Sequence, residues 1–383
     1  MYRYKMKLHL VAGARPNFMK IAPLLRGLAN HPVIRPSFVH TAQHFDDAMS
    51  STIWRELGLP DPDHVLNCEP FENGDPIVGM MQAYEALCHE DRPDMVLVVG
   101  DVNSSRAAAI VAIEINVPLV HLEAGLRCFD PEMPEEQNRI EIDHKADLLL
   151  TPSMDADENL RAEGITADRI KRVGNIMADT LAIMKGTIDQ EESARKLNLV
   201  KGRYVLVTLH RQSNVDDLGR LHQISHALMA LATKADSCFV LHPRTEKRLR
   251  TSNLMAALHN AGVRLLPPMG YVGFTSLMQD AGVVVTDSGG VQEETSLLGV
   301  PCLTLRNSTE RPITITQGTN QLVGLDQLSH AVMSALSVSD GCKRTPAKLP
   351  LWDGMTASRV VRELEAFLPG RAGLYKRSRE GLG

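Results

Sequence analysis

The stretch from 283 to 311 constrains the fold more strongly than any other part of the chain. Residues 283–285 are three valines, a β-branched run that is typical of a buried parallel strand. The run stops at the turn 287–290, a helical pattern follows as far as Gly299, and Pro301 opens a second apolar strand. Strand, glycine turn, helix and strand form a βαβ unit, so we expect a parallel sheet here.

The glycine turn of this unit lies where the backbone N–H groups at a helix start can hold a phosphate. Gly289 and Gly290 let the main chain approach a ligand, because neither has a Cβ. Taken alone, the two glycines fit a tight turn that binds nothing just as well. Ser288 before them, Glu294 on the helix and Arg311 past the next strand favour a ligand site.

The length of 383 residues predicts two domains or one large one. A net charge of −5 without any basic block, and only 4% aromatic residues, argue against nucleic acid as a partner. The six cysteines form no CxxC pair and indicate reduced core residues in a cytoplasmic protein. We expect neither a signal peptide nor a membrane-spanning segment, because no apolar run is long enough.

Two cations open the first predicted helix. Residues 8–12 form a short apolar strand, Arg15 follows its glycine turn, and Lys20 lies one helical turn further on. This turn is not the GxGxxG fingerprint of a dinucleotide site. Arg15 and Lys20 suit an anionic ligand, although each one alone is also compatible with a solvated surface charge.

Acidic residues follow two further strands of the first half. Asp101 comes after a fully apolar strand, at the position where open α/β sheets carry their sites, although it could also cap the next helix. Glu123 ends the following strand, where a structural role is harder to assign. Two prolines keep the next segment from forming a helix until about Glu135, with Arg139 one turn later.

The second half repeats the arrangement of a strand followed by polar residues. His210 and Arg211 follow a strand at 204–209, and His242 follows a strand at 238–241. A single histidine at a strand end also suits a purely structural hydrogen bond. The pairing of His210 with a neighbouring cation favours a site.

These patterns predict an α/β protein with two Rossmann-like, doubly wound domains facing a cleft. We place the first domain at residues 1–172 and expect it to carry the acid and base residues. The second domain, 173–354, contains the phosphate-binding turn, and the terminal helix within 355–383 is expected to pack back on the first domain.

The assembled motifs resemble the non-hydrolysing UDP-N-acetylglucosamine 2-epimerases. The resemblance runs in order from Gly13 to Asn320 through GARPNFMK, TAQHFD, GDVNSS, HLEAGLR, MPEEQNR, GNIMADT, TLHRQSN, HPRT, DSGGVQEE, TERP and GTN. It implies the two-domain arrangement shared with many nucleotide-sugar glycosyltransferases (GT-B-like), a homodimer, and a UDP-sugar substrate.

The resemblance also implies where the ligand lies. UDP is expected on the second domain, with the diphosphate on the glycine turn, the ribose at Glu294, and the uracil against Met269 and Phe274. The implied catalytic residues are Asp101, Glu123, Glu135 and His210, and the implied substrate-binding residues are Arg15, Lys20, Arg139, Arg211, His242, Met269, Phe274, Ser288, Gly289, Gly290, Glu294 and Arg311.

The implied reaction interconverts UDP-N-acetylglucosamine and UDP-N-acetylmannosamine. The C2 hydrogen of the sugar is not next to a carbonyl, so the expected route expels UDP while C2 loses its proton and later adds UDP back. Such a route needs cations for the diphosphate and proton-transfer groups on two sides of the ring. It needs no nicotinamide, and we expect neither a cofactor nor a metal. Which carboxylate is the base and which the acid stays open.

The chain departs from the family pattern at two places. Asn17 stands where the common form has Glu, and residues 43–46 read QHFD where many members have QHR. Asp46 puts an activating second UDP-N-acetylglucosamine site in question, and the QHFD form also occurs in UDP-diacetamido-uronic acid 2-epimerases. The intact TERP at 309–312 favours the N-acetylglucosamine branch. Three competing functions stay compatible with these motifs, namely a glycosyltransferase, a hydrolysing epimerase and a non-catalytic nucleotide-sugar sensor.

Overall fold

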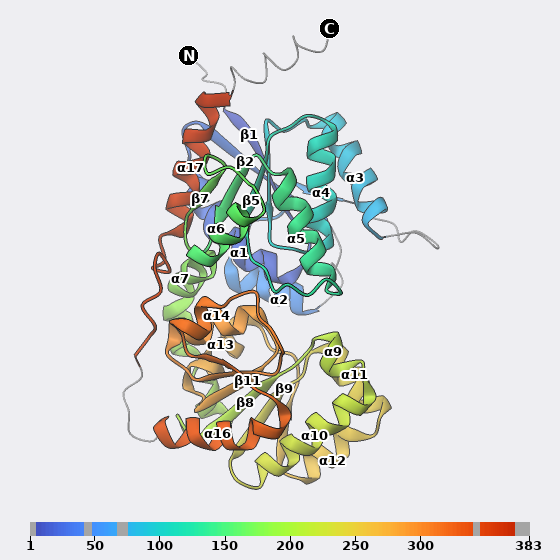
Figure 1. Cartoon of the computed structure of the whole chain (residues 1–383), viewed down its shortest axis with the longest axis vertical. Helices are drawn as coiled ribbons and strands as arrows, with labels where there is room; N and C mark the ends of the chain where they lie inside the picture. The colour runs from blue at the N-terminus through green and yellow to red at the C-terminus, as the bar shows by residue number, and fades with distance from the viewer. Residues whose placement is uncertain (1–4, 42–47, 67–75, 340–344, 372–383) are drawn as a thin grey trace. The chain divides into compact units, whose positions relative to one another are not determined.

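The computed structural model describes residues 5–41, 48–66, 76–339 and 345–371. Contacts divide the chain into two compact units (Figure 1). The seven-stranded unit comprises Met1–Ile183 together with Pro350–Gly383, and the six-stranded unit comprises Met184–Leu349. In the part of the chain that is described, no helix combines the length and the apolar character needed to cross a bilayer.

The seven-stranded unit is built on a parallel sheet with the strand order β3-β2-β1-β4-β5-β6-β7. Its strands are β1 (Met6–Ala12), β2 (Ile34–His40), β3 (His64–Val65), β4 (Met95–Val99), β5 (Leu119–Leu122), β6 (Leu148–Thr151) and β7 (Ile170–Arg172). Its helices are α1 (Arg15–Leu28), α2 (Ala48–Leu57), α3 (Pro76–Glu90), α4 (Asn103–Glu114), α5 (Pro134–Lys145), α6 (Met154–Ala162), the first part of α7 (Ile176–Glu191) and α17 (Thr356–Arg371). The strand order reverses between β1 and β4, which makes this the switch point of a doubly wound sheet.

The core of this unit follows from continuous apolar strands. All five residues of β4 are buried, as expected for a parallel strand that helices cover on both faces. Helix α4 presents small side chains to the sheet, with buried alanines at 107–109 and 112. These alanines let α4 approach β4 and β5 closely, so the loop that follows β4 is held at a defined position.

The six-stranded unit repeats this topology with the order β10-β9-β8-β11-β12-β13. Its strands are β8 (Tyr204–Thr208), β9 (Asp236–Val240), β10 (Val263–Leu266), β11 (Val283–Thr286), β12 (Cys302–Thr304) and β13 (Asn320–Leu322). Its helices are the end of α7, α8 (Ser193–Lys196), α9 (Gln212–Val215), α10 (Leu218–Ala232), α11 (Pro243–Thr251), α12 (Leu254–Asn260), α13 (Tyr271–Asp280), α14 (Gly289–Leu298), α15 (Ile313–Thr316) and α16 (Leu325–Ser339). The switch point lies between β8 and β11.

The predicted βαβ unit is present as β11, α14 and β12. Helix α14 ends at Gly299, whose φ of 70° is left-handed, and an added Cβ there would come 2.8 Å from the Thr345 backbone. The fold class is confirmed, because both sheets are parallel and doubly wound with helices on their faces. The short strands β3, β7 and β13 were not predicted, since runs of two or three residues have no readable period.

The terminal helix α17 belongs to the seven-stranded unit and packs on α1. Its first turn is capped by Asp179 of α7, whose carboxylate accepts hydrogen bonds from Thr356 N at 3.0 Å and Ala357 N at 2.8 Å. The indole of Trp352 donates to the Pro152 carbonyl at 3.0 Å, which fixes the segment that leads into α17.

Candidate functional site

Polar residues gather beyond the switch point of each sheet. In the seven-stranded unit they follow β1, β4 and β5, and in the six-stranded unit they follow β8, β11 and β12. We name the first group the acid cluster; it consists of Lys20, Asp101, Glu123, Glu135, Glu136 and Arg139. We name the second group the turn cluster; it consists of His210, Arg211, Asp287, Ser288, Gly289, Gly290 and Arg311.

Glu123 is the most constrained member of the acid cluster. It follows β5 with a left-handed φ of 69°, a conformation that costs a residue other than glycine about 1–3 kcal/mol. Its Oε2 pairs with Lys20 Nζ, and both side chains are buried. Its Oε1 is buried without a hydrogen-bond partner among the residues that the structure describes. A buried carboxylate oxygen of this kind can accept a proton, or a hydrogen bond from a donor group of a ligand.

Gly100 makes room for this ion pair. Its φ is 64°, and an added Cβ would lie 3.2 Å from Lys20 Nζ and 3.3 Å from Glu123 Oε2. Glycine is therefore required on two grounds, the left-handed backbone and the ion pair in front of it. The residue before Asp101 in the loop after β4 therefore lies against the Lys20–Glu123 pair.

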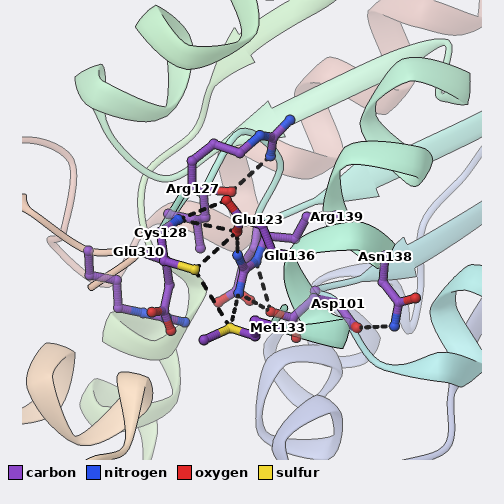
Figure 2. Close-up of polar contacts among 12 residues, drawn as sticks. Asp101, Glu123, Arg127, Cys128, Met133, Glu136, Asn138, Arg139 and Glu310 are labelled. Atoms are coloured by element: carbon purple, nitrogen blue, oxygen red, sulfur yellow. Dashed lines mark hydrogen bonds and ion pairs between the residues drawn. The ribbon is translucent and has the colours of Figure 1, made fainter. Parts of the chain in front are cut away.

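Arg139 connects two carboxylates of the acid cluster (Figure 2). Its Nε donates to Asp101 Oδ2 at 2.9 Å, and its Nη1 pairs with Glu136 Oε2. Glu136 in turn accepts the backbone N–H groups of Cys128 and Phe129. Val102 rather than Asp101 is the N-cap residue of α4, so the capping interpretation of Asp101 is wrong. The guanidinium is almost fully buried, whereas Asp101 is partly exposed, which leaves the aspartate accessible to a substrate.

A second layer of charges lies behind the acid cluster and is centred on Asp143 of α5. Asp143 accepts the Gly125 N–H at 3.0 Å and pairs with Arg127 at 2.7 Å and with His121 Nδ1 at 2.6 Å. The other ring nitrogen of His121 lies 3.0 Å from the Gly100 carbonyl. Burial raises the pKa of Asp143, but the pairs with His121 and Arg127 outweigh it and hold the pKa below its ordinary value. One carboxylate therefore ties together the loops that carry Asp101 and Glu123.

Three further predicted positions belong to this unit. Glu135 lies exposed on the first turn of α5, next to the buried Glu136. Helix α1 begins at Arg15, but the Arg15 side chain lies outside the described residues, as do residues 43–46. Asn17 is buried and donates to the Val99 carbonyl at 3.1 Å, a bond that a glutamate at this position could not make.

Asp287 organises the turn cluster from the end of β11. Its carboxylate accepts the His210 and Arg211 N–H groups, both at 3.0 Å, and the Asn214 amide at 3.1 Å. His210 Nδ1 lies 3.2 Å from the same carboxylate. Burial raises the pKa of Asp287, but these hydrogen bonds and His210 hold the pKa below its ordinary value. Asp287 therefore orients the His210 ring, whose side chain is partly exposed.

Arg311 lies directly against the glycine turn. Its guanidinium pairs with Glu293 and Glu310, and a Cβ added to Gly289 would come 2.4 Å from Arg311 Nη1. By contrast, a Cβ built on Gly290 would have no atom of another described segment within 4 Å. Gly289 thus accommodates a cation from within the protein, and Gly290 leaves open space in front of the start of α14.

A buried polar network holds Arg311 in place. Gln292 Oε1 accepts Thr309 Oγ1 at 2.6 Å and Asn320 Nδ2 at 3.0 Å, and Asn320 Oδ1 accepts Thr304 Oγ1 at 2.7 Å. The three segments after β11, β12 and α15 are therefore fixed to one another. Such fully connected networks make a loop rigid.

The remaining predicted residues of the six-stranded unit lie beside α13 or at the start of α11. Met269 and Phe274 pack, partly buried, against the core beside α13. Glu294 is buried next to Tyr271, and burial together with this carboxylate raises the pKa of Tyr271 well above its ordinary value. His242 caps α11 by accepting the Arg244 N–H at 3.2 Å, and its ring lies 5.2 Å from that of His210. A structural hydrogen bond at a strand end is thus present at His242.

Four residues of these clusters were not predicted as site residues, namely Glu136, His121, Asp143 and Asp287. Three of them lie inside the motifs named above, but their spacing alone does not separate a buried acceptor from a neighbouring exposed acid. Asp143 lies outside every motif, and its role depends on contacts made on folding.

The chain is similar to known proteins over almost its whole length. A family model described as UDP-N-acetylglucosamine 2-epimerase matches residues 26–365. A UDP-N-acetylglucosamine 2-epimerase of Methanocaldococcus jannaschii is 38% identical over 94% of this chain and 99% of its own length. A UDP-2,3-diacetamido-2,3-dideoxy-D-glucuronate 2-epimerase of Pseudomonas aeruginosa is 36% identical over 83% of this chain and 88% of its own.

Solved structures give the same result. The M. jannaschii UDP-GlcNAc 2-epimerase in complex with UDP-GlcNAc and UDP has a TM-score of 0.86 at 38% identity, over 94% of this chain and 100% of that one. A UDP-GlcNAc 2-epimerase from Neisseria meningitidis bound to UDP-GlcNAc has a TM-score of 0.84 at 27% identity, over 94% of this chain and 100% of that one.

Proposed function

Because the chain belongs to the UDP-N-acetylglucosamine 2-epimerase family, we propose that it interconverts UDP-N-acetylglucosamine and UDP-N-acetylmannosamine without hydrolysing them. The observation that carries this proposal is the likeness to the M. jannaschii enzyme solved with UDP-GlcNAc and UDP, which extends over 94% of the chain. The two clusters supply the groups that the reaction needs.

The proposed reaction passes through elimination and re-addition. A carboxylate takes the proton from C2, the electron pair forms the C1–C2 double bond, and the C1–O bond breaks as UDP leaves with its electrons. A proton is then delivered to the other face of C2 while the UDP oxygen attacks C1. The intermediate is 2-acetamidoglucal, and no atom or electron is gained or lost over the cycle.

The acid cluster supports the proton-transfer steps. We assign them to Asp101, Glu123 and Glu135, since each follows a strand or opens a helix at one edge of the sheet. Glu123 combines a strained backbone, one paired oxygen and one oxygen with no hydrogen-bond partner among the residues described, which suits a group that exchanges a proton. Lys20 and Arg139 hold the carboxylates in place and keep positive charge next to them.

The turn cluster supports nucleotide binding. We assign the diphosphate to Ser288, Gly289, Gly290 and the N-terminus of α14, where the helix dipole favours an anion. His210, Arg211 and Arg311 bring positive charge or hydrogen-bond donors to this turn, together with His242. We also assign Arg15 to substrate binding. Glu294 would take the ribose and Met269 and Phe274 the uracil. Preorganised donors of this kind stabilise the negative charge that develops on the leaving UDP.

The test is a proton NMR time course with UDP-N-acetylglucosamine in deuterated water. We expect UDP-N-acetylmannosamine to accumulate with deuterium at C2, and without an added acceptor. Free UDP accumulating with turnover would identify a hydrolysing epimerase instead. Binding of the UDP-sugar without any exchange would indicate a sensor, and turnover only with an acceptor would indicate a glycosyltransferase.

A second substrate has a specific observation in its favour. The P. aeruginosa relative is named for a UDP-diacetamido-glucuronate and is as similar, at 36%, as one of the UDP-N-acetylglucosamine 2-epimerases of Methanococcus maripaludis. Comparing kcat/KM for the two UDP-sugars decides between them. We expect the plain N-acetylglucosamine substrate to be preferred, because the TERP segment is intact.

We also propose a cytoplasmic homodimer that works without a cofactor. The free, buried thiols of Cys88, Cys128, Cys238 and Cys302 suit a reducing compartment. Light scattering coupled to gel filtration tests the dimer, and full activity after chelator treatment tests the absence of a metal from the reaction.

A further inference from the structure

Strand register brings two histidines of the seven-stranded unit to one face of the sheet. His9 of β1 is paired with Ser37 of β2, and His64 of β3 is paired with Val39 of β2. Ser37 and Val39 are two residues apart, so they lie on the same face of β2. His9 and His64 therefore face the same side, with the small Ser37 side chain between them.

Helix α3 covers this face and adds a carboxylate. Asp91 directly follows α3, and its Oδ2 lies 3.0 Å from His64 Nε2 and 3.7 Å from His9 Nε2. One ligand atom from each of the three residues lies within 4.8 Å of the other two. None of the three belongs to the acid cluster.

His9 is the unusual member of this group. Its side chain is fully buried, and its Nε2 has no hydrogen-bond partner within the described ranges of the chain. Its other nitrogen, Nδ1, lies 3.2 Å from the Tyr84 hydroxyl. A ligating histidine usually has such a partner on its second nitrogen, which fixes the tautomer and aims the ring.

We propose that His9, His64 and Asp91 bind a divalent first-row transition ion of the zinc class. Two imidazoles and one carboxylate are a ligand set that this class of ions accepts, with a water at the fourth position. His64 and Asp91 are each about 30% exposed, so the ion has a path from solvent to the buried His9 nitrogen. Bound there, it clamps β1, β3 and the end of α3 and takes no part in the epimerisation.

Lys7 is the competitor for this site. Its ammonium pairs with Asp91. An ion pair of Lys7, Asp91 and His64 alone would satisfy the aspartate without any metal, but it leaves the buried His9 nitrogen unexplained. If a divalent ion binds, it must displace the ammonium, so removing the lysine charge should strengthen binding.

The experiment uses the full chain without a histidine tag, freed of metal with a chelator and then titrated with Zn²⁺ by calorimetry. His64→Ala and the near-isosteric Asp91→Asn are the test variants, and His89→Ala, an exposed histidine on α3, is the matched control. We expect a zinc site that His89→Ala retains, that both test variants weaken about tenfold or more, and that Lys7→Ala tightens. Zinc should also raise the melting temperature of wild type more than that of His64→Ala.

The neighbouring rings of His210 and His242 could bind zinc independently, so the comparison between variants is decisive rather than the total stoichiometry. Equal zinc affinity in wild type, His64→Ala and Asp91→Asn would overturn the proposal. So would the absence of zinc binding in folded wild type. Circular dichroism checks that each variant is folded. If His64→Ala does not fold, the comparison with wild type is made with Asp91→Asn.

Discussion

The acid cluster and the turn cluster occupy equivalent places in two sheets of the same topology. Asp287 in one and Glu123 in the other nevertheless differ in the number of groups that pair with their carboxylates. Asp287 in the turn cluster accepts hydrogen bonds from three neighbouring residues, and Glu293 and Glu310 both pair with Arg311. Glu123 in the acid cluster pairs with Lys20, has a strained backbone and keeps one oxygen without a hydrogen-bond partner in the described part of the chain. The well-paired Asp287 keeps the turn rigid, whereas the buried Glu123 oxygen remains available for proton transfer.

The largest effect is expected from Glu123→Gln, a substitution in the acid cluster. Glu123→Gln keeps the shape of the side chain but removes the proton-accepting charge, so kcat and C2 exchange should fall about 10²- to 10⁴-fold. UDP affinity should stay unchanged. Glu141→Gln, a partly buried acid of α5 paired with Arg106 and Lys145, is the control and should keep its activity. Normal epimerisation by Glu123→Gln would refute the assignment.

The second prediction concerns the layer behind the acid cluster. Asp143→Asn removes the buried carboxylate that pairs with Arg127 and His121, although Arg127 keeps its pair with Glu163, and this should cost about 3 kcal/mol of unfolding free energy. Because the loops carrying Asp101 and Glu123 loosen, we expect kcat to fall about tenfold. The UDP dissociation constant should not move, which separates a positioning role from general unfolding. Chemical denaturation, turnover and UDP titration measure the three quantities.

The lowered pKa of Asp143 also predicts how the free energy of unfolding changes with pH. Its pKa is lowered in the folded state, so the unfolded chain binds its proton first as pH falls. The stability that it contributes is full above its unfolded pKa of about 3.9 and is lost as pH falls through the folded pKa. Wild type should therefore lose more stability than Asp143→Asn between pH 7 and pH 3. Parallel stability curves for the two proteins would count against this pairing.

The third prediction separates the two glycines of the turn cluster. Gly289→Ala places a methyl group against Arg311 and should destabilise the fold by about 1–3 kcal/mol and weaken UDP binding. The methyl group of Gly290→Ala meets no other segment among the described residues, so this variant should leave stability intact and weaken only UDP binding. Melting curves with and without UDP measure both effects. Unchanged UDP affinity in Gly290→Ala would place the diphosphate elsewhere.

The smallest effect tests the acid sensitivity of the seven-stranded unit. Burial lowers the pKa of His40, which stacks on Phe18, from 6.5 to about 4. As pH falls below 6.5, the His40 imidazole is therefore protonated in the unfolded chain before it is protonated in the folded one. The stability that the neutral ring contributes is lost progressively down to about pH 4. From pH 8 to pH 5 this amounts to about 2 kcal/mol. His40→Gln should show a shallower loss in urea titrations, and an equal slope would contradict the burial argument.

Much of the fold was accessible from the sequence. The apolar runs at 95–99 and 283–285 predicted parallel strands, and the residues that follow them, Asp101 and the glycine turn, were placed at sheet edges. This works because a strand buried on both faces must be apolar throughout, and because a site residue just past such a strand has a fixed position. The short edge strands were missed, since they are held by their neighbours rather than by their own composition.

The partners of the site residues could not be predicted in the same way. Lys20 and Glu123 are 103 residues apart, and Arg139 and Asp101 are 38 apart, so only the folded sheet brings them together. The distinction between Glu135, which is exposed, and Glu136, which is buried and bonded, depends on which side of α5 faces the loop after β5.

Local pattern was thus enough to define the longer strands, the glycine turn and the residue types available for chemistry, because these follow from short-range periodicity and backbone conformation. Tertiary structure alone selected which carboxylates are neutralised and which keep an unpaired oxygen, because charge pairing depends on distances between residues remote in the chain. The same reasoning separates Asp287, which several donors hold, from Glu123, which pairs with Lys20.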